Sequence, residues 1–196
     1  MKKLFFLLLL LPLAACFDAE MKLVVHDDDT ATVKSVITMG PEAYQMAAAS
    51  GDDPCEDGVG TVLDDGGYQC VTEETDTIDN LIAKLNEEAD AAGDDGMSPA
   101  QSAKIERLEN GDLRVSFDLA ELKQAAAESG MEPAMIAMMQ QAFEGRAITL
   151  SIEGEIIESN GATTAGGDRS QLRLELAKIL MQDPSVPDSF VTIVRP

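Results

Sequence analysis

The stretch MKLVVHDDDTATVKSVITM, residues 21–39, contains two runs of strand-forming residues on either side of three aspartates. In residues 21–25 large apolar side chains occupy alternate positions, which is the period of a half-buried β-strand. Asp27, Asp28 and Asp29 are typical turn residues, and a β-branched run follows over residues 30–39. The stretch therefore predicts a strand, a tight turn and a second strand.

The rest of the chain alternates between strand and helix patterns. The clearest hairpin is at residues 103–119, where Asn110-Gly111 separates two runs and the second alternates strictly. Other strands are predicted at residues 68–72, 146–153, 155–159, 170–176 and 190–194, with Gly154 as a bulge. Helices are predicted at residues 41–50, 77–92, 119–128 and 131–143, whereas residues 176–181 fit either state. Antiparallel strands with helices between them predict an α+β fold.

The N-terminus has the parts of an export signal. Met1-Lys2-Lys3 precedes an apolar run of residues 4–13, which is too short to span about 30 Å of hydrocarbon. The following Leu13-Ala14-Ala15-Cys16 resembles the lipobox of bacterial lipoproteins. That resemblance implies cleavage before Cys16, a diacylglyceryl thioether on its thiol and acylation of the new amine. Residues 1–15 would then be a signal peptide and residues 16–196 a single envelope domain; the alternative is an ordinary signal peptide cut near Ala15.

The charge of the chain excludes one class of partner. The sequence has 36 acidic and 14 basic residues, a formal net charge of −22. Loss of Lys2 and Lys3 with the leader removes two of the 14, which gives 12 basic against 36 acidic residues and a charge of −24. Such a surface repels phosphates, so we expect no nucleic-acid partner. Solubility in a salty medium explains the acidity most simply, and divalent-cation bridging to a negatively charged envelope is the alternative.

The cysteines fit an exported protein. With Cys16 lipidated, Cys55 and Cys70 remain as a pair. Their spacing is unlike that of redox or zinc motifs, so we predict a structural disulfide. It would close a loop of about 15 residues and contribute roughly 3 kcal/mol to stability.

Residues for catalysis are scarce. His26 is the only histidine, so a two-histidine zinc motif is impossible, and we interpret it as a surface residue near a turn. The sequence has neither a nucleophile elbow nor a nucleotide-binding glycine loop. Asp27-Asp28-Asp29 lacks the spacing of a Ca²⁺ loop and is interpreted as a solvated turn. We therefore expect no catalytic residues, no metal, no cofactor and no enzymatic activity.

One segment is a candidate for ligand binding. Residues 131–143, MEPAMIAMMQQAF, place several methionines on one helical face. Methionine side chains are flexible and adapt to irregular apolar surfaces. The segment is either a core helix over the sheet or a wall of a groove for an acyl chain or a partner's apolar segment. In the second case the lining residues would be Met135, Met138, Met139 and Phe143.

Two segments resemble a known group of proteins. Residues 21–31, MKLVVHDDDTA, are similar to the opening strand-turn-strand of the LppM-like bacterial lipoprotein domain. Residues 152–161, IEGEIIESNG, and the later LRLEL at residues 172–176 are similar to the late strand and closing strand of that domain. The resemblance spans about residues 20–176, and it implies a twisted antiparallel sheet with helices mainly on one face, no catalytic residues and lipid binding at the envelope. Asp28-Asp29 stands where the group usually has Asp-Gly, and no membrane segment follows the domain.

These features give a leading hypothesis and an alternative. The chain would be a non-enzymatic lipoprotein, anchored through lipid on Cys16 and facing the periplasm, which binds a lipid or another apolar ligand. The sequence leaves both membranes of the envelope open as the site of the anchor, because Phe17 follows Cys16 and the acidic residue comes second, at Asp18. The alternative is a protein-interaction or assembly factor that docks a partner, whose identity is unknown, through its acidic surface.

Overall fold

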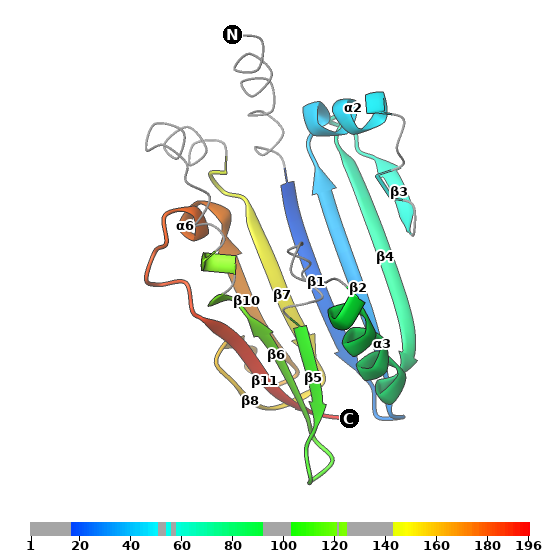
Figure 1. Cartoon of the computed structure of the whole chain (residues 1–196), viewed down its shortest axis with the longest axis vertical. Helices are drawn as coiled ribbons and strands as arrows, with labels where there is room; N and C mark the ends of the chain where they lie inside the picture. Colours follow the sequence, from blue (N-terminus) through cyan, green and yellow to red (C-terminus); the bar gives the residue numbers. More distant parts are fainter. Residues whose placement is uncertain (1–16, 51–53, 56–57, 92–102, 121, 125–142) are drawn as a thin grey trace.

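The computed structural model describes residues 17–50, 54–55, 58–91, 103–120, 122–124 and 143–196. In this part of the chain most residues belong to strands, and the helices are short (Figure 1). The first half contains β1 (Phe17–Val25), β2 (Thr30–Met39), α2 (Pro41–Ser50), β3 (Val59–Val62), β4 (Tyr68–Thr77) and α3 (Ile78–Ala91). The second half contains β5 (Ala103–Arg107), β6 (Leu113–Asp118), β7 (Ala147–Glu153), β8 (Glu155–Ser159), β9 (Ala162–Thr163), β10 (Arg169–Glu175), α6 (Leu176–Leu180) and β11 (Ser189–Arg195).

The strands form two sheets. The larger sheet has seven strands in the order β3-β4-β2-β1-β7-β10-β9, and the smaller has four in the order β5-β6-β11-β8. Every pairing is antiparallel except that of β1 with β7, which is parallel. The larger sheet is therefore mixed, and the smaller is antiparallel.

The predicted strand-turn-strand of residues 21–39 is confirmed, and it lies near the centre of the larger sheet. Met21 pairs with Ser35 and Leu23 with Val33, so the side chains of alternate residues share one face. Asp29 adopts a positive φ of 64° in the turn, a conformation that aspartate tolerates better than most residues. Its carbonyl accepts the N–H of Ile78 at 3.1 Å, which ties the turn to the start of α3.

The predicted hairpin of residues 103–119 is also confirmed and forms half of the smaller sheet. Ile105 pairs with Val115, and the N–H of Leu108 donates to the carbonyl of Asp112 at 2.8 Å across the Asn110-Gly111 turn. Gly111 has a φ of +89°, where a side chain would be strained. The hairpin therefore follows from local sequence.

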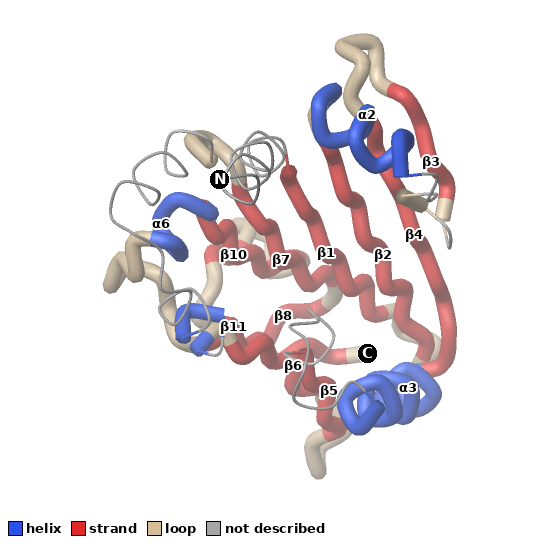
Figure 2. Tube along the Cα trace, turned by 45° about the horizontal axis from the view of Figure 1, so that its top comes forward, coloured by secondary structure: helices blue, strands red, loops and turns tan. Residues whose placement is uncertain are grey.

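The two sheets face one another across the main hydrophobic core (Figure 2). Ile152 of the larger sheet and Phe190 and Val194 of the smaller are completely buried. Helix α3 contacts β2, β4 and β5, and so closes one side of the space between the sheets. Its buried residues Ile78 and Leu81 form the apolar stripe that the spacing predicts.

The expectation of one antiparallel sheet with helices mainly on one face is wrong. The apolar face of β1, β2 and β7 is covered by a second sheet, and β7 runs parallel to β1. The α+β class itself is correct. Alternation identifies the buried face of each strand, but it does not specify which element covers that face.

Gly154 marks the point where the chain passes from one sheet to the other. Its N–H donates to Asp168 at 3.0 Å, and its φ is +143°, a region that favours glycine. A Cβ here would lie 2.7 Å from Cγ2 of Val194. The predicted bulge is thus a crossing: β7 precedes it in the larger sheet and β8 follows it in the smaller.

A second, smaller apolar cluster surrounds a disulfide. Cys55 and Cys70 are bonded with an S–S distance of 2.02 Å, and both are buried with Tyr68. The Tyr68 ring stacks on Tyr44 of α2 with a centroid distance of 4.5 Å. The disulfide therefore joins the segment before β3 to β4 beneath α2.

The two ends of the molecule differ in what they contain. The start of β1 lies near α2 and α6, whereas the 27–29 turn, the 108–112 turn and the C-terminus lie at the opposite end (Figure 1). Among the described residues, no helix has the length and apolar character needed to cross a bilayer.

Candidate functional site: an apolar pocket between the sheets

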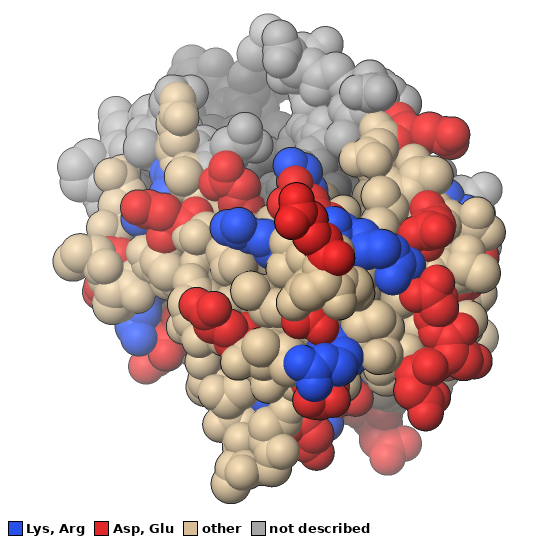
Figure 3. Space-filling model, turned by 90° about the horizontal axis from the view of Figure 1, so that it is seen from below, with Lys and Arg blue, Asp and Glu red and all other residues tan. Residues whose placement is uncertain are grey.

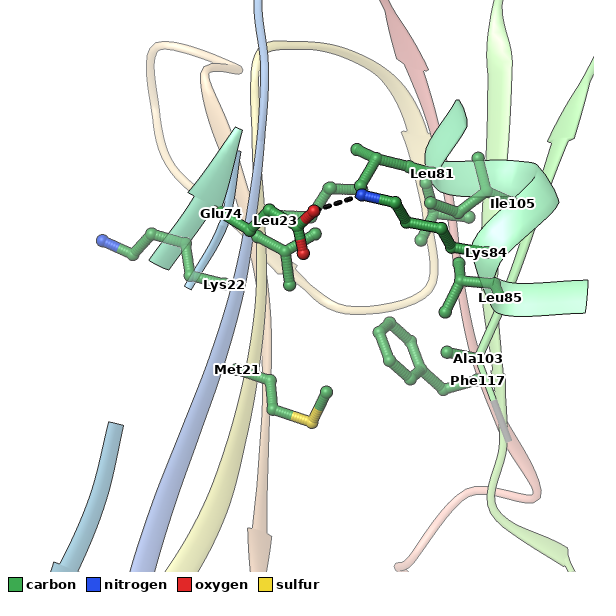
Figure 4. A pocket seen from close by; sticks show the side chains of 12 residues that line it. Met21, Lys22, Leu23, Glu74, Leu81, Lys84, Leu85, Ala103, Ile105 and Phe117 are labelled. Atoms are coloured by element: carbon green, nitrogen blue, oxygen red, sulfur yellow. Dashed lines mark hydrogen bonds and ion pairs between the residues drawn. The ribbon is translucent and has the colours of Figure 1, made fainter. Parts of the chain in front are cut away.

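An apolar pocket lies between the two sheets beside α3 (Figure 4). Its volume is about 200 Å³, and nine of the twelve lining residues in the described part of the chain are apolar. The apolar residues are Met21, Leu23, Val33, Leu81, Leu85, Ala103, Ile105, Val115 and Phe117. The charged residues are Lys22, Glu74 and Lys84.

Three parts of the fold supply this lining. Met21, Leu23 and Val33 come from the inner face of the larger sheet, in adjacent register positions of β1 and β2. The β5–β6 hairpin contributes the opposite wall, including Phe117, whose ring points toward the Met21 thioether across the pocket (Figure 4). The apolar face of α3 closes one side of the pocket, where Leu85 contributes to the lining. The pocket exists because β1 and β5 are brought face to face.

The described lining of the pocket becomes more exposed toward the end of the molecule where β1 begins. On β1 the residue nearer that end, Met21, is half-buried, whereas Leu23 is buried. The same holds on α3, which runs back toward that end: Leu85 is half-buried and Leu81 is buried. Among the described lining residues, the closed floor therefore lies deeper in the core and the accessible part lies toward the start of β1.

Charged groups form a rim at one side of the pocket. The Lys84 ammonium on α3 pairs with Glu74 and also donates to Asp76 Oδ2 at 2.9 Å. Hydrogen bonds from Asn80, from Lys84 and from the Thr77 N–H lower the pKa of Asp76 from 3.8 to about 2. The two carboxylates raise the pKa of Lys84 well above its ordinary value. Lys22 points away from the pocket (Figure 4), and its ammonium lies 3.2 Å from Glu153.

The dimensions limit what the pocket can hold. A dry cavity of about 150 Å³ lined by aliphatic and aromatic residues is large enough for benzene. A pocket of about 200 Å³ is therefore large enough for an aromatic ring or the terminal part of an acyl chain, but too small for an entire lipid. The charged rim cannot enter the apolar interior without losing its hydration.

The comparisons with known proteins identify one similar fold. The structure matches the folded domain of LppM. That domain, from Mycobacterium tuberculosis and solved by NMR, is 16% identical to this chain, with a TM-score of 0.47. The match covers 92% of this chain and 90% of that chain, and it is to the same kind of domain that the sequence resembles. No family model matches the chain, and no curated protein sequence does either.

The structure places only some of the site residues predicted from the sequence. Cys16, Met135, Met138 and Met139 lie outside the described residues. Phe143 lies half-buried in the turn before β7, and it is not among the residues that line the pocket. The role of this group in ligand binding thus stays a prediction.

The pocket residues themselves were visible in the sequence only as strand and helix patterns. Alternation marks Met21 and Leu23 as inward-facing, and the helical stripe marks Leu81 and Leu85. Each pattern is equally typical of a filled core. No local signal indicates that these three elements leave a space between them.

His26 lies half-buried before the aspartate turn, and Asp27, Asp28 and Asp29 are exposed. His26 Nε2 lies 2.9 Å from the Thr32 hydroxyl, and Asp28 accepts hydrogen bonds from the backbone N–H and hydroxyl of Thr30. The Thr30 bonds lower the pKa of Asp28, as expected for a carboxylate that caps a turn. Within the described residues, no group of three or more His, Cys, Asp or Glu side chains is placed to hold a metal ion.

Proposed function

We propose that this chain is an envelope lipoprotein that binds an acyl chain, or another apolar group of similar width, in the pocket between its sheets. The observation that carries the proposal is the pocket itself, since nine of its twelve described lining residues are apolar. Small-molecule sites in proteins are typically concave and mostly apolar with a few polar groups at fixed positions. Here the Glu74–Lys84 pair supplies the polar rim.

The anchor is the second part of the proposal. The lipobox-like Leu13-Ala14-Ala15-Cys16 supports lipidation of Cys16 and residence at the cell envelope. Each buried methylene contributes about 0.8 kcal/mol, so two or three acyl chains hold a domain at a membrane stably. Replacing Cys16 with alanine should abolish incorporation of labelled palmitate and release the chain from the membrane fraction.

We propose a binding role rather than an enzymatic one. The titratable groups at the pocket rim, Glu74 and Lys84, are paired with each other, and neither is set beside a nucleophile in the described part of the lining. Catalytic sites usually combine a nucleophile with a base in hydrogen-bond reach. The residues that line the pocket therefore support ligand binding rather than catalysis.

Photocrosslinking tests where a ligand binds. The full-length lipidated chain in phospholipid nanodiscs would be irradiated with a fatty acid that carries a diazirine near its methyl end. We expect crosslinks on β1, α3 and β5. The change Ala103→Trp fills the pocket from β5 and should lower the crosslink yield at least several-fold.

The same change at an exposed position provides the control. Ala162 lies exposed on β9 in the larger sheet, so Ala162→Trp should leave crosslinking unchanged. Thermal melts of both tryptophan variants separate loss of ligand binding from loss of folding. A further variant, Leu85→Gln, disfavours an apolar ligand by adding a polar group to the pocket instead of bulk. Equal yields in all variants, or crosslinks confined to other elements, would show that the pocket is not the binding site.

A further inference from the structure

We propose that the end of the domain where β1 begins lies directly against the bilayer, so that the pocket opens toward lipid and not toward the periplasm. This inference rests on the proposed lipidation of Cys16. It assigns an interaction surface to this end of the domain. The partner is the membrane in which the anchor is inserted.

The first observation is the distance between the anchor and the sheet. β1 begins at Phe17, the residue that follows Cys16, and Phe17 is already paired with Met39 of β2. Consecutive Cα atoms are about 3.8 Å apart. A lipid on Cys16 would thus leave no linker between the bilayer and the end of the larger sheet.

The start of β1 is held firmly in this position. The Asp18 carboxylate lies 2.6 Å from Nη1 of Arg146, and its other oxygen accepts the Ala147 N–H at 3.0 Å. Arg146 in turn accepts the N–H of Leu176, the first residue of α6, at 3.0 Å. These bonds link β1 to β7 and α6, so the strand cannot peel away to act as a tether without breaking them.

The second observation concerns the apolar side chains that are exposed at this end. The register aligns Phe17, Met39, Tyr68 and Val62 in one row across β1, β2, β4 and β3. Val62 is 57% exposed. Met181, which follows α6 on the other side of β1, is 48% exposed. In the proposed orientation both side chains would face the bilayer, together with Asp64 and Asp65, which are exposed in the turn after β3.

The opposite end also carries several ion pairs. Arg107 lies 2.9 Å from Asp29 and 3.1 Å from Asp79, while Arg195 pairs with Asp112 and Glu155. Basic side chains lie among acidic ones on the face seen in Figure 3. Such groups lose their hydration when they are moved out of water. The end with these ion pairs favours water, and the end that adjoins Cys16 is the one placed at the bilayer by the anchor.

This orientation gives the pocket a route to its ligand. The half-buried residues Met21 and Leu85 mark its accessible side, which faces the end where β1 begins. An acyl chain could then pass from the bilayer into the pocket without crossing water. Binding of only the end of an acyl chain in the pocket is compatible with a lipid whose head group remains at the membrane–water interface.

Two exposed positions at opposite ends allow a matched test. Met181 and Ile157 are similarly exposed, at 48% and 44%, and Ile157 lies on β8 in the smaller sheet. Full-length lipidated chains carrying Met181→Cys or Ile157→Cys would be labelled with a thiol-reactive fluorophore. They would then be inserted in vesicles of phosphatidylethanolamine and phosphatidylglycerol that contain nitroxide-labelled lipid. We expect at least threefold stronger quenching at position 181 than at position 157.

A spacer variant separates orientation from anchoring. Inserting about 20 Gly and Ser residues between Cys16 and Phe17 adds a span of roughly 25 Å. The variant should still float with vesicles, but quenching at position 181 should fall. Equal quenching at both positions, or stronger quenching at 157, would overturn the orientation while leaving the anchor intact. Failure of the unmodified chain to incorporate palmitate and to float would overturn the anchor and the orientation together.

Discussion

Ser170 Oγ of the larger sheet lies 2.6 Å from Ser159 Oγ of the smaller sheet, in the interior where the two sheets meet. Ser159 also lies 2.8 Å from the hydroxyl of Thr192. Ser170 and Thr192 have no exposed surface. These three hydroxyls satisfy one another within an apolar core, which fixes the relative position of β8, β10 and β11.

Ser170→Ala should destabilise the fold. Removal of one hydroxyl leaves its buried partners with fewer hydrogen bonds, a loss that typically costs about 1–3 kcal/mol. Urea unfolding followed by circular dichroism measures the change. Ser116→Ala on β6, where the serine is only half-buried, is the matched control and should cost less. Equal stability of the two variants would mean that the hydroxyl network contributes nothing to sheet packing.

Gly161→Ala should be more damaging than the same change at Gly166. A Cβ at Gly161 would lie 2.5 Å from Cε2 of Phe190 and 2.8 Å from the Gln171 carbonyl, so buried groups must shift. Overpacking of this kind costs about 1–3 kcal/mol. At Gly166 the nearest atom would be 3.6 Å away, an ordinary contact. Thermal melts of the two variants should differ clearly, and similar melting temperatures would contradict the close packing of the Gly161 turn.

Reduction should lower the stability of the wild-type chain. The Cys55–Cys70 disulfide has a sequence separation of 15, and a loop of this length gives roughly 3 kcal/mol on the chain-entropy model. A thermal melt with and without a phosphine reductant measures the effect. The double change Cys55→Ala/Cys70→Ala should resemble the reduced protein and respond to reductant no further. A reductant effect of the same size in that variant would show that another bond is responsible.

Asp76 should make the chain sensitive to acid. Its pKa falls from 3.8 to about 2 in the folded state because Asn80, Lys84 and the Thr77 N–H bind its charged form. A depressed pKa gives stability that is present above pH 3.8 and is lost as the pH falls toward 2. Asp76→Asn should therefore destabilise the chain at pH 7 and make less difference near pH 2. Urea titrations at both pH values test this, and a pH-independent difference would refute it.

The hairpins and the helices α2 and α3 could be predicted because their determinants are close in sequence. The helices predicted at residues 119–128 and 131–143 lie mostly outside the described residues. Asn110-Gly111 provides the conformations that its turn needs, and the α3 stripe repeats at helical spacing. The edge strands β3 and β9 were missed. Val59 and Val62 are both exposed, so β3 has no buried face to produce an apolar alternation.

The pairing of β1 with β7 could not be predicted. Ala19 pairs with Ile148 and Met21 with Leu150, across more than a hundred intervening residues. Any strand with one apolar face could pair with β1, so the partner of β1 is selected by how the whole sheet is buried. The pocket depends on the same choice, because it lies between β1 and a hairpin that no local pattern assigns to it.

The sequence by itself determined which side of each strand is buried, where the hairpins turn, which cysteines remain to form a pair and the lipobox-like Cys16 beside β1. Tertiary structure decided that there are two sheets, that the strand after Gly154 joins the smaller one, and that Met21 faces Phe117 across a pocket. The physical reason is the distance along the sequence over which each interaction acts. Backbone period and turn conformation act over a few residues, whereas sheet pairing and the space between sheets depend on how all the apolar faces of the chain are buried together.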